Sequence, residues 1–315
     1  MQTTALAILI ALAVDRLWGE PPARFHPVVA MGRYLGWAGG HFAPAMGQTY
    51  LPLRVFVGGA VAWAVGAGLI VAMAALSVMA LHDVSSLLQA LLLGLLLKPL
   101  LAWRLLREEV RAVEAALAQS LSAGRARLAW LVSRDVSTLS ETQVRESAIE
   151  SLAENLNDSV VAPLFWFVLA GLPGAALYRF ANTADAMWGY RGERDGRDWT
   201  WAGTWAARAD DLLSWAPARL TALLLGTWGL RGPWPALRRL PGEARQTPSP
   251  NSGWPMAAMA LGLGVRLGKP GVYTLNASGR APEPADTARA IARATLVLHT
   301  LCAGTLLCLA WGGVP

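Results

Sequence analysis

Long apolar stretches are the feature that most constrains the fold. Val55–Ala80 contains no charged residue, Val84–Leu106 contains two, and Thr295–Trp311 contains none. A helix of about 20 apolar residues crosses the hydrocarbon core of a bilayer. Together with a shorter stretch, Thr3–Val14 running on to Trp18, these segments predict four full membrane spans. A charged fraction of 15% agrees, because soluble domains contain about 25% charged residues.

Two further apolar stretches, Val160–Phe180 and Leu212–Leu230, are interrupted by prolines. Arginines occupy the connections between apolar stretches, which places these connections on the cytoplasmic side. With every basic connection cytoplasmic, four segments cross and the two broken stretches enter and return, or pack as bent helices inside the bundle. A six-span arrangement, with the connection 179–211 outside, stays open. The predicted fold is an all-α, polytopic integral membrane helical bundle with broken or re-entrant helices and cytoplasmic amphipathic helices.

The organisation along the chain indicates a single membrane-embedded catalytic domain over residues 1–315. Within it, we expect a cytoplasmic helical insertion at about 107–159, made of two polar helices split near Ser122–Gly124. The net charge of +6 is dispersed in loops, so we expect no nucleic-acid binding, which requires a basic patch or stripe. No phosphate-binding glycine loop, zinc-protease motif or cysteine framework occurs.

A column of acidic residues provides the strongest chemical signal. Glu146, Glu150, Glu154 and Asp158 recur at every fourth position, with Asn155 beside them. Like charges four apart on a helix repel by roughly 0.2–0.5 kcal/mol per pair, and no lysine interrupts the column. We therefore expect a cation there, Mg²⁺ or a cationic ligand, since carboxylates together with phosphate oxygens bind Mg²⁺. A solvated helix face is the alternative.

Four further polar clusters lie in the connections, around residues 15–32, 181–192, 203–220 and 249–265. Guanidinium groups bind phosphate or carboxylate through paired hydrogen bonds, although anchoring on the cytoplasmic side of the membrane explains any single arginine better. Arg219 is the exception, because it lies inside an apolar stretch, where a charge is costly. For His26 a rigid turn before the next helix is the alternative. The candidates for substrate binding are His26, Arg134, Asn182, Arg191, Arg208, Arg219 and Asn251.

Taken together, these clusters resemble the CobD/CbiB family of cobalamin biosynthesis proteins. The strings that support this resemblance occur in family order between about residues 15 and 265: DRLWGEPPARFHPVVAMG, ESLAENLNDSVVAPLFW, NTADAMWGYR, ARADDLLSWAPARLTALLL and SPNSGWPMAAMALGLGV. Two departures are visible. Glu20 stands where the family usually has Asp, and Leu156 stands where a small polar residue is common.

The resemblance implies an ATP-dependent adenosylcobinamide-phosphate synthase. Such an enzyme joins adenosylcobyric acid to 1-amino-2-propanol, or its O-phosphate, through an amide bond, with ATP and Mg²⁺ as implied cofactors. We expect Glu154 and Asp158 to hold Mg²⁺ and Asp210 to accept the proton of the amine. Trp188, Trp201 and Trp254 are candidates for packing against the corrin, with anchoring at the membrane interface as the alternative. The implied catalytic residues are Glu150, Glu154, Asn155, Asp158, Asp185, Asp210 and Asp211.

The same resemblance implies a multi-pass protein of the bacterial inner membrane, with active-site loops facing the cytoplasm. Its expected partners are adenosylcobyric acid, aminopropanol or its O-phosphate, and the lipid bilayer. A homo-oligomer, or contact with later enzymes of cobalamin assembly, is a further expectation. A non-catalytic membrane sensor or scaffold and a transporter are the alternative functions.

Overall fold

The structure is a computed structural model that describes residues 2–227 and 233–311. Its regular structure is almost entirely helical, with two short β-hairpins, and it contains four helices long and apolar enough to cross a membrane. The predicted all-α membrane protein is therefore confirmed. The chain divides into two compact units, which are described one at a time.

The four candidate spans are Pro52–Ala80, Ser86–Leu117, Glu141–Trp188 and Pro284–Ala310. Pro52–Ala80, Ser86–Leu117 and Pro284–Ala310 overlap stretches that the sequence predicted as full spans. Glu141–Trp188 contains the stretch that the sequence predicted as broken. The N-terminal stretch forms helix α1 (Gln2–Trp18) of 17 residues, just below the 18-residue length that defines a candidate span. The candidate spans therefore differ from the predicted full spans at two places: α1 is not among them, and Glu141–Trp188, which contains a stretch predicted as broken or re-entrant, is.

The candidate span Glu141–Trp188 comprises 48 residues, many more than the about 20 residues that cross a bilayer. A bilayer core is only about 30 Å thick. Within this helix, residues 160–178 contain no charge, whereas residues 141–158 contain five carboxylates and Arg145. Residues 160–178 are therefore the part of this segment whose composition suits the hydrocarbon of a bilayer.

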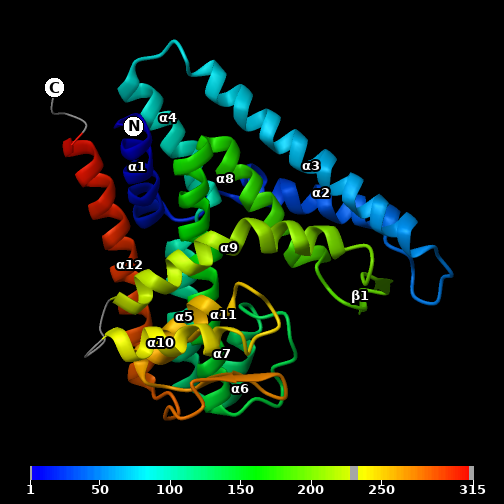
Figure 1. The fold of residues 1–315 in the computed structure, drawn as a ribbon, viewed down its shortest axis with the longest axis vertical. Helices are drawn as coiled ribbons and strands as arrows, with labels where there is room; N and C mark the ends of the chain where they lie inside the picture. The colour runs from blue at the N-terminus through cyan, green and yellow to red at the C-terminus, as the bar shows by residue number, and fades with distance from the viewer. Residues whose placement is uncertain (1, 228–232, 312–315) are drawn as a thin grey trace. The chain divides into compact units, whose positions relative to one another are not determined.

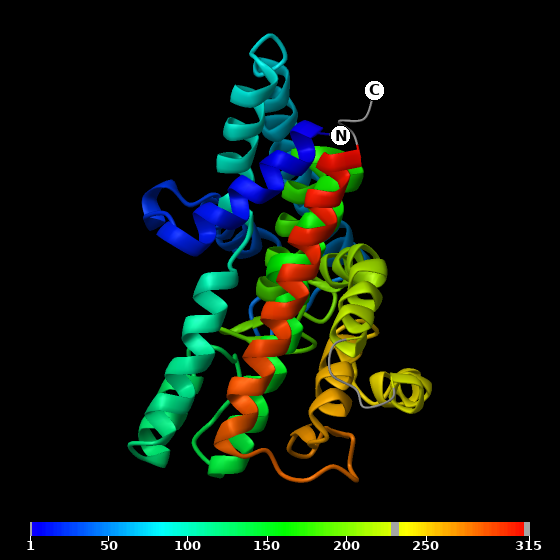
Figure 2. The same ribbon diagram turned by 90° about the vertical axis from the view of Figure 1, so that its left-hand side faces the viewer.

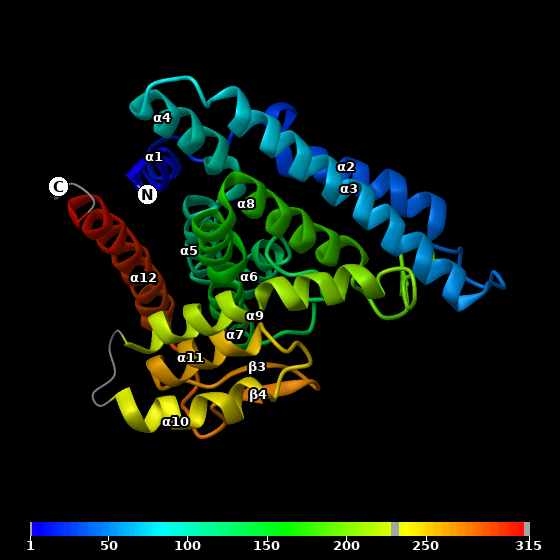
Figure 3. The same ribbon diagram turned by 45° about the horizontal axis from the view of Figure 1, so that its top comes forward.

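Unit 1 comprises residues 1–102, 162–214 and 308–315. Helix α1 packs along α4, and α3 packs against both α2 and α8 (Figures 1 and 3). The elements after α1 are η1 (Ala23–Phe25), α2 (Pro27–Phe42), α3 (Pro52–Ala80), α4 (Ser86–Leu97), η2 (Lys98–Leu100), α8 (Ala162–Trp188), the hairpin β1 (Glu193–Arg194) and β2 (Arg197–Asp198), and the start of α9 (Thr204–Thr227).

Helix α8 is broken where the sequence predicts an interruption. Ala170 has φ −135° and ψ 17°, and Gly171 has φ 63° and ψ −159°, so neither residue is helical. Pro173 follows, and a proline lacks the N–H that would continue the helix. The predicted break in Val160–Phe180 is confirmed, whereas Pro217 lies inside α9 without ending it.

Unit 2 comprises residues 103–161 and 215–307. It contains α5 (Trp103–Leu117), α6 (Leu121–Leu128), α7 (Glu141–Leu156), the π-helical turn η3 (Asn157–Val161), most of α9, α10 (Pro233–Ala244), α11 (Gly253–Leu263), the hairpin β3 (Leu267–Lys269) and β4 (Tyr273–Leu275), and most of α12 (Pro284–Trp311). Figure 2 shows α12, from orange to red, as one unbroken helix.

The helices at the start of unit 2 differ from the prediction of a split near Ser122–Gly124. Residues Ser122–Gly124 do not separate two helices but lie within α6. A Cβ on Gly124 would lie 2.3 Å from the Leu117 Cδ2, so this glycine permits close packing of α6 against α5. Val113, Leu128 and Val144 form a buried core with Leu117. The glycine was therefore misread as a break because its packing role depends on a neighbouring helix.

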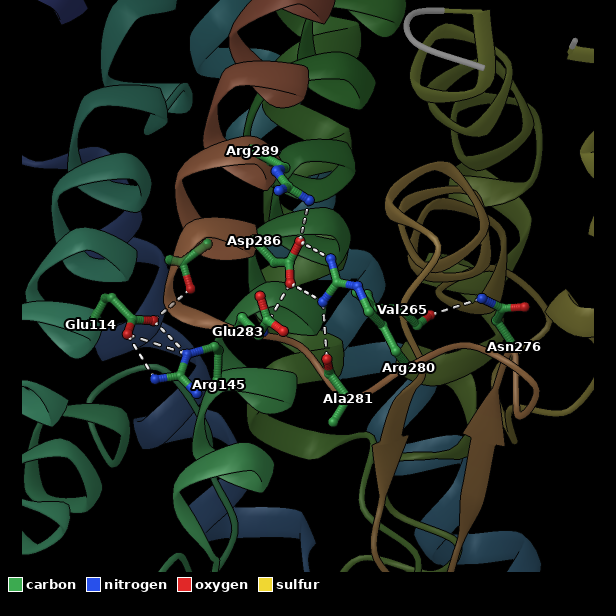
Figure 4. A network of polar contacts seen from close by, with 10 residues as sticks. Glu114, Arg145, Val265, Asn276, Arg280, Ala281, Glu283, Asp286 and Arg289 are labelled. Atoms are coloured by element: carbon green, nitrogen blue, oxygen red, sulfur yellow. Dashed lines mark hydrogen bonds and ion pairs between the residues drawn. The ribbon is translucent and has the colours of Figure 1, made fainter. Parts of the chain in front are cut away.

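An arginine with a buried side chain, Arg145, connects helices of unit 2 through ion pairs (Figure 4). The Arg145 side chain, 4% exposed, donates hydrogen bonds to both carboxylate oxygens of Glu114 and to Glu141. The Thr287 hydroxyl of α12 donates to Glu114 as well, at 2.6 Å. This network connects α5, α7 and α12. It satisfies the charge of Arg145, the one basic residue near the acidic column in sequence.

Candidate functional site

A polar cavity of about 370 Å³ lies within unit 2. This volume is within the range of small-molecule sites. Four of the sequence candidates line it, namely Arg134, Glu150, Glu154 and Asn155. The cavity therefore brings part of the acidic column together with the cluster around Arg134. Further lining residues are Ser133, Ser147, Ser151, Thr247, Ser249, Ser252, Lys269 and Tyr273.

Glu150 is the central carboxylate of this cavity. Its side chain is 5% exposed, and its Oε1 is buried without a hydrogen-bond partner in the part of the chain that the structure describes. Burial raises the pKa of Glu150 to about 7, although the charges of Arg134 and Lys269 and a hydrogen bond from Tyr273 oppose the shift. A carboxyl group with such a pKa can both hold and release a proton near neutral pH.

Helix α7 presents Glu150 because its opposite face is apolar and buried. Val144, Ile149 and Leu152 are fully buried, which fixes the rotation of the helix. A capping box starts the helix: the Ser140 hydroxyl accepts from the Gln143 N–H, and the Gln143 side chain accepts from the Ser140 N–H. Such a pair satisfies two backbone donors that a helix start otherwise leaves open.

The hairpin β3–β4 contributes a lysine and a tyrosine to the cavity. Lys269 and Tyr273 are opposite each other in its antiparallel register, and Gly271 in the turn has φ +73°. Side chains opposite each other on paired strands lie on the same face. Burial, and then the charge of Glu150, raise the pKa of Tyr273. Tyr273 therefore stays protonated and can donate a hydrogen bond to a carboxylate.

Arg134 is the ion-pair partner of Glu150 in the cavity. Its Nη2 donates to the Ser147 hydroxyl at 2.6 Å and lies 3.7 Å from Glu150 Oε2. The Arg134 Nε is buried and has no hydrogen-bond partner among the described residues. A guanidinium with an unused donor beside a cavity is suited to bind an oxyanion.

The loop before α11 forms a further wall, held in place by Arg219. The Arg219 guanidinium donates to the Asn251 side-chain oxygen at 2.6 Å and to the Pro250 carbonyl at 3.2 Å. It also lies 4.7 Å from the ring centres of both Trp215 and Trp254. Neither Arg219 nor Asn251 lines the cavity. Their observed contacts position the loop, and their predicted contact with substrate stays a prediction.

The structure corrects the expectation that the acidic column has no paired cations. Arg266 Nε donates to Glu146 Oε1 at 3.3 Å, and Arg134 is the ion-pair partner of Glu150. Both arginines are distant from the carboxylates in sequence, which explains why the helix alone looked uncompensated. The alternative of a solvated face is also wrong for Glu146 and Glu150, because both are buried.

Asp158 occupies the π-helical turn η3 and accepts a hydrogen bond from Asn157 at 2.8 Å. The Asn157 oxygen in turn accepts from the Thr221 hydroxyl of α9 at 3.0 Å. Asp158 does not line the cavity. Within residues 2–227 and 233–311, no group of three or more His, Cys, Asp or Glu residues is placed to hold a metal ion. Binding of Mg²⁺ by Glu154 and Asp158 stays a prediction.

The remaining candidates belong to unit 1. The Asn182 amide donates to Asp210 at 3.4 Å, which joins the clusters around 181–192 and 203–220. Burial raises the pKa of Asp211, and the charge of Arg191 opposes that shift. The two adjacent aspartates therefore have different neighbours, as their positions on different helical faces predict. Arg208 lies on α9 and is exposed.

A glycine fixes the position of Asp185. The Gly189 N–H donates to the Asp185 carbonyl at 2.7 Å, and a Cβ on Gly189 would lie 1.9 Å from Asp185 Oδ1. No side chain fits in that space, so glycine allows the aspartate to lie against the end of α8.

His26 caps helix α2. Its Nδ1 accepts from the Val28 N–H at 3.2 Å, so in the neutral ring Nε2 carries the proton that faces Glu20, at 3.0 Å. Glu20 also pairs with Lys98 at 2.9 Å, and Lys98 with Asp15 at 3.4 Å. These contacts agree with the rigid-turn alternative for His26, while its predicted role in substrate binding stays untested.

One expected aromatic contact is wrong. Trp188 is 1% exposed, donates from its indole to the Leu35 carbonyl at 3.2 Å and stacks on Trp199. It is part of the core of unit 1 and cannot pack against a corrin.

Sequence reasoning missed three residues of unit 2. Lys269 and Tyr273 belong to a hairpin that the sequence analysis did not predict, and Asn157 was hidden inside the acidic motif. One signal was available for Lys269, because only two lysines occur in the whole chain. The π-helical turn that contains Asn157 became visible only in the structure.

Comparisons with known proteins agree with this picture. The sequence model of the family described as CobD/Cbib protein matches residues 8–298. The chain is 39% identical to the probable cobalamin biosynthesis protein CobD of Methanothermobacter thermautotrophicus, covering 94% of this chain and 95% of that protein. It is 43% identical to the cobalamin biosynthesis protein CobD of Chromobacterium violaceum, covering 84% and 81%. No solved structure matches the chain.

Proposed function

This chain belongs to the CobD/CbiB family of cobalamin biosynthesis proteins, and from that membership we propose that it joins adenosylcobyric acid to 1-amino-2-propanol O-phosphate through an amide bond. The family membership supports the corrinoid substrate. The charged residues of the cavity around Glu150 support the choice of an amine that carries a phosphate as the second substrate. We propose that the reaction takes place on the cytoplasmic side of the inner membrane, where ATP is available.

One observation carries the proposal: a buried carboxylate with an unused oxygen, that of Glu150, lines the same cavity as Arg134 and Lys269. An amino-alcohol phosphate contains one ammonium and one phosphate a few bonds apart. Arg134 and Lys269 supply two positive charges for the phosphate, and hydroxyls such as that of Ser249 supply donors. Glu150 then accepts the ammonium. Free aminopropanol would bring no anion to these two cations, which already share the carboxylate of Glu150, so the phosphate ester is the better fit.

We infer that the carboxylate of adenosylcobyric acid is first activated as an acyl phosphate. The carboxylate oxygen bonds to the γ-phosphorus of ATP, and ADP leaves. Glu150, whose pKa of about 7 suits this transfer, takes one proton from the ammonium and so frees the lone pair of the nitrogen. The amine nitrogen then attacks the acyl carbon and the C–N bond forms. The bond from carbon to the phosphate oxygen breaks, and phosphate leaves with the second proton of the nitrogen. We assign to Glu150 the proton transfer that the sequence assigned to Asp210, because Glu150 lies in the cavity.

The donors in the cavity fit a magnesium ion only in part. Mg²⁺ in phosphate-transfer sites uses one or two carboxylates and completes its shell with phosphate oxygens and water. Glu154 lines the cavity, and Asp158 follows one turn later, so these two carboxylates would hold an ion that enters with the nucleotide. When bound, such an ion neutralises phosphate charge and polarises the phosphoryl oxygen.

The test is a product assay by mass spectrometry. Purified protein receives adenosylcobyric acid, Mg-ATP, and equal amounts of aminopropanol and its O-phosphate. The proposal predicts the phosphorylated amide as the main product. Accumulation of the unphosphorylated amide would contradict the assignment of Arg134 and Lys269. A sensor or scaffold would yield neither amide.

An isotope experiment tests the activation step. With ¹⁸O in the reacting carboxylate of adenosylcobyric acid, acyl phosphate formation transfers one ¹⁸O atom to the released phosphate. Unlabelled phosphate, formed together with the amide product, would exclude this intermediate.

A further inference from the structure

The largest cavity described in unit 1 lies between α2, α3 and the connection 43–51. Its volume is about 1100 Å³. The two helices that form it are antiparallel: Tyr34 of α2 donates to the Ala62 carbonyl of α3 at 2.7 Å, and Phe42 lies beside Gly58. The cavity has no part in the proposed reaction.

Polar and apolar groups are separated along this cavity. At one end lie Gln48, Thr49 and Arg54, with Arg197 from the β1–β2 hairpin. Towards the other end, the α3 wall is apolar. Arg54 to Val65 is eleven residues along α3, or about 16 Å. The cavity therefore has a polar mouth and an apolar wall as long as a good part of an acyl chain.

The apolar wall is a stripe of valines on a membrane-spanning helix. Val57, Val61 and Val65 are each four residues apart and 47%, 56% and 51% exposed. Trp37 of α2, 64% exposed, lines the same cavity. Helix α3 is one of the candidate spans, so exposed apolar side chains on it face lipid. Tryptophan is enriched at the level of the lipid headgroups.

The charge of the cavity is positive. Arg54 and Arg197 line it with His41, and no Asp or Glu occurs among its lining residues in the part of the chain that the structure describes. Asp198 is adjacent and accepts a hydrogen bond from Tyr50 at 2.6 Å. Arg197 is engaged with the Ala43 carbonyl through Nη1. Among the described residues Arg54 forms no ion pair, so its guanidinium is available to an anion.

We propose that this cavity is a binding site for one anionic phospholipid of the surrounding bilayer. The phosphate lies at Arg54 with Arg197 beside it, and one acyl chain follows Val57, Val61 and Val65. The occupant is a lipid because the cavity combines a cationic mouth with an apolar wall that already faces the membrane. Basic pockets next to membrane helices on the cytoplasmic side bind anionic headgroups in this way.

Native mass spectrometry tests the proposal. The full-length protein is placed in nanodiscs with equal amounts of phosphatidylglycerol and phosphatidylcholine and then released. The intact protein should retain one phosphatidylglycerol in preference to phosphatidylcholine. Arg54→Gln should reduce that preference about fivefold, since one arginine near the headgroup contributes about that factor. Arg33→Gln is the matched control, because Arg33 is an exposed arginine of α2 that does not line the cavity.

A second variant tests the apolar wall without changing charge. Val61→Trp fills the groove and should abolish retention of the lipid. Equal retention of both lipids, or an equal effect of Arg33→Gln and Arg54→Gln, would overturn the proposal. Displacement by free glycerol phosphate would show a soluble phosphate ligand instead, and a lipid-free dimer would show that a second copy covers the groove. Either result would also overturn it.

Discussion

Replacing Glu150 by Gln should stabilise the protein at alkaline pH and stop the reaction. The pKa of Glu150 is raised from 4.5 to about 7, chiefly by burial. Each pKa unit corresponds to 1.36 kcal/mol, so the shift corresponds to about 3 kcal/mol. The folded state binds this proton more tightly than the unfolded state does. The resulting stability is complete below pH 4.5 and is lost as the pH rises through about 7.

Glutamine carries no charge and therefore avoids this loss. The free energy of unfolding of Glu150→Gln, minus that of the original protein, should increase by roughly 2 to 3 kcal/mol between pH 5 and pH 8. Thermal unfolding in detergent at a series of pH values measures the difference, and the values at pH 5 serve as the internal control. A difference that stays constant from pH 5 to pH 8 would refute the claim that Glu150 is a buried, titrating carboxyl group.

Three further predictions concern other residues. Arg145→Met should lower the free energy of unfolding by about 3 kcal/mol, because it leaves the Glu114 carboxylate without its main partner; chemical unfolding measures it, and a loss under 1 kcal/mol would contradict the network. Lys269→Met should raise the KM for aminopropanol phosphate about tenfold and leave the KM for free aminopropanol unchanged; equal effects on both would remove Lys269 from phosphate binding. Gly189→Ala should displace Asp185, because the new Cβ would overlap its Oδ1 and lie 2.8 Å from its carbonyl oxygen, and should lower both kcat and thermal stability. An unchanged kcat would show that the position of Asp185 is unimportant.

The membrane character of the fold could be predicted from local sequence. Residues 55–80 are uncharged, and few structures other than a membrane-spanning helix accommodate an apolar run of that length. The break near Gly171 and Pro173 could also be predicted, because proline acts through its own covalent geometry. By contrast, Gly124 acts through the Leu117 side chain of another helix, and no periodicity within α6 reveals that contact.

The candidate site was only partly predictable for the same reason. The spacing of Glu146, Glu150 and Glu154 places them on one helix, but the partners of these carboxylates come from elsewhere in the chain. Arg266 is 120 residues from Glu146, and Tyr273 is on a hairpin that forms only when β3 pairs with β4. Burial of Glu150, which sets its pKa, likewise results from tertiary packing and not from its neighbours in sequence.

The central claim is that Glu150 takes the proton of the amine in the cavity of unit 2. Single-turnover amide formation by Glu150→Gln and Glu146→Gln, at saturating substrates and pH 8, tests it most directly. Both carboxylates are buried on α7, and only Glu150 lines the cavity. We predict that Glu146→Gln forms the amide at close to the original rate, whereas Glu150→Gln is slower by at least about 100-fold, the usual contribution of a general base. Equal rates in the two variants would contradict the account.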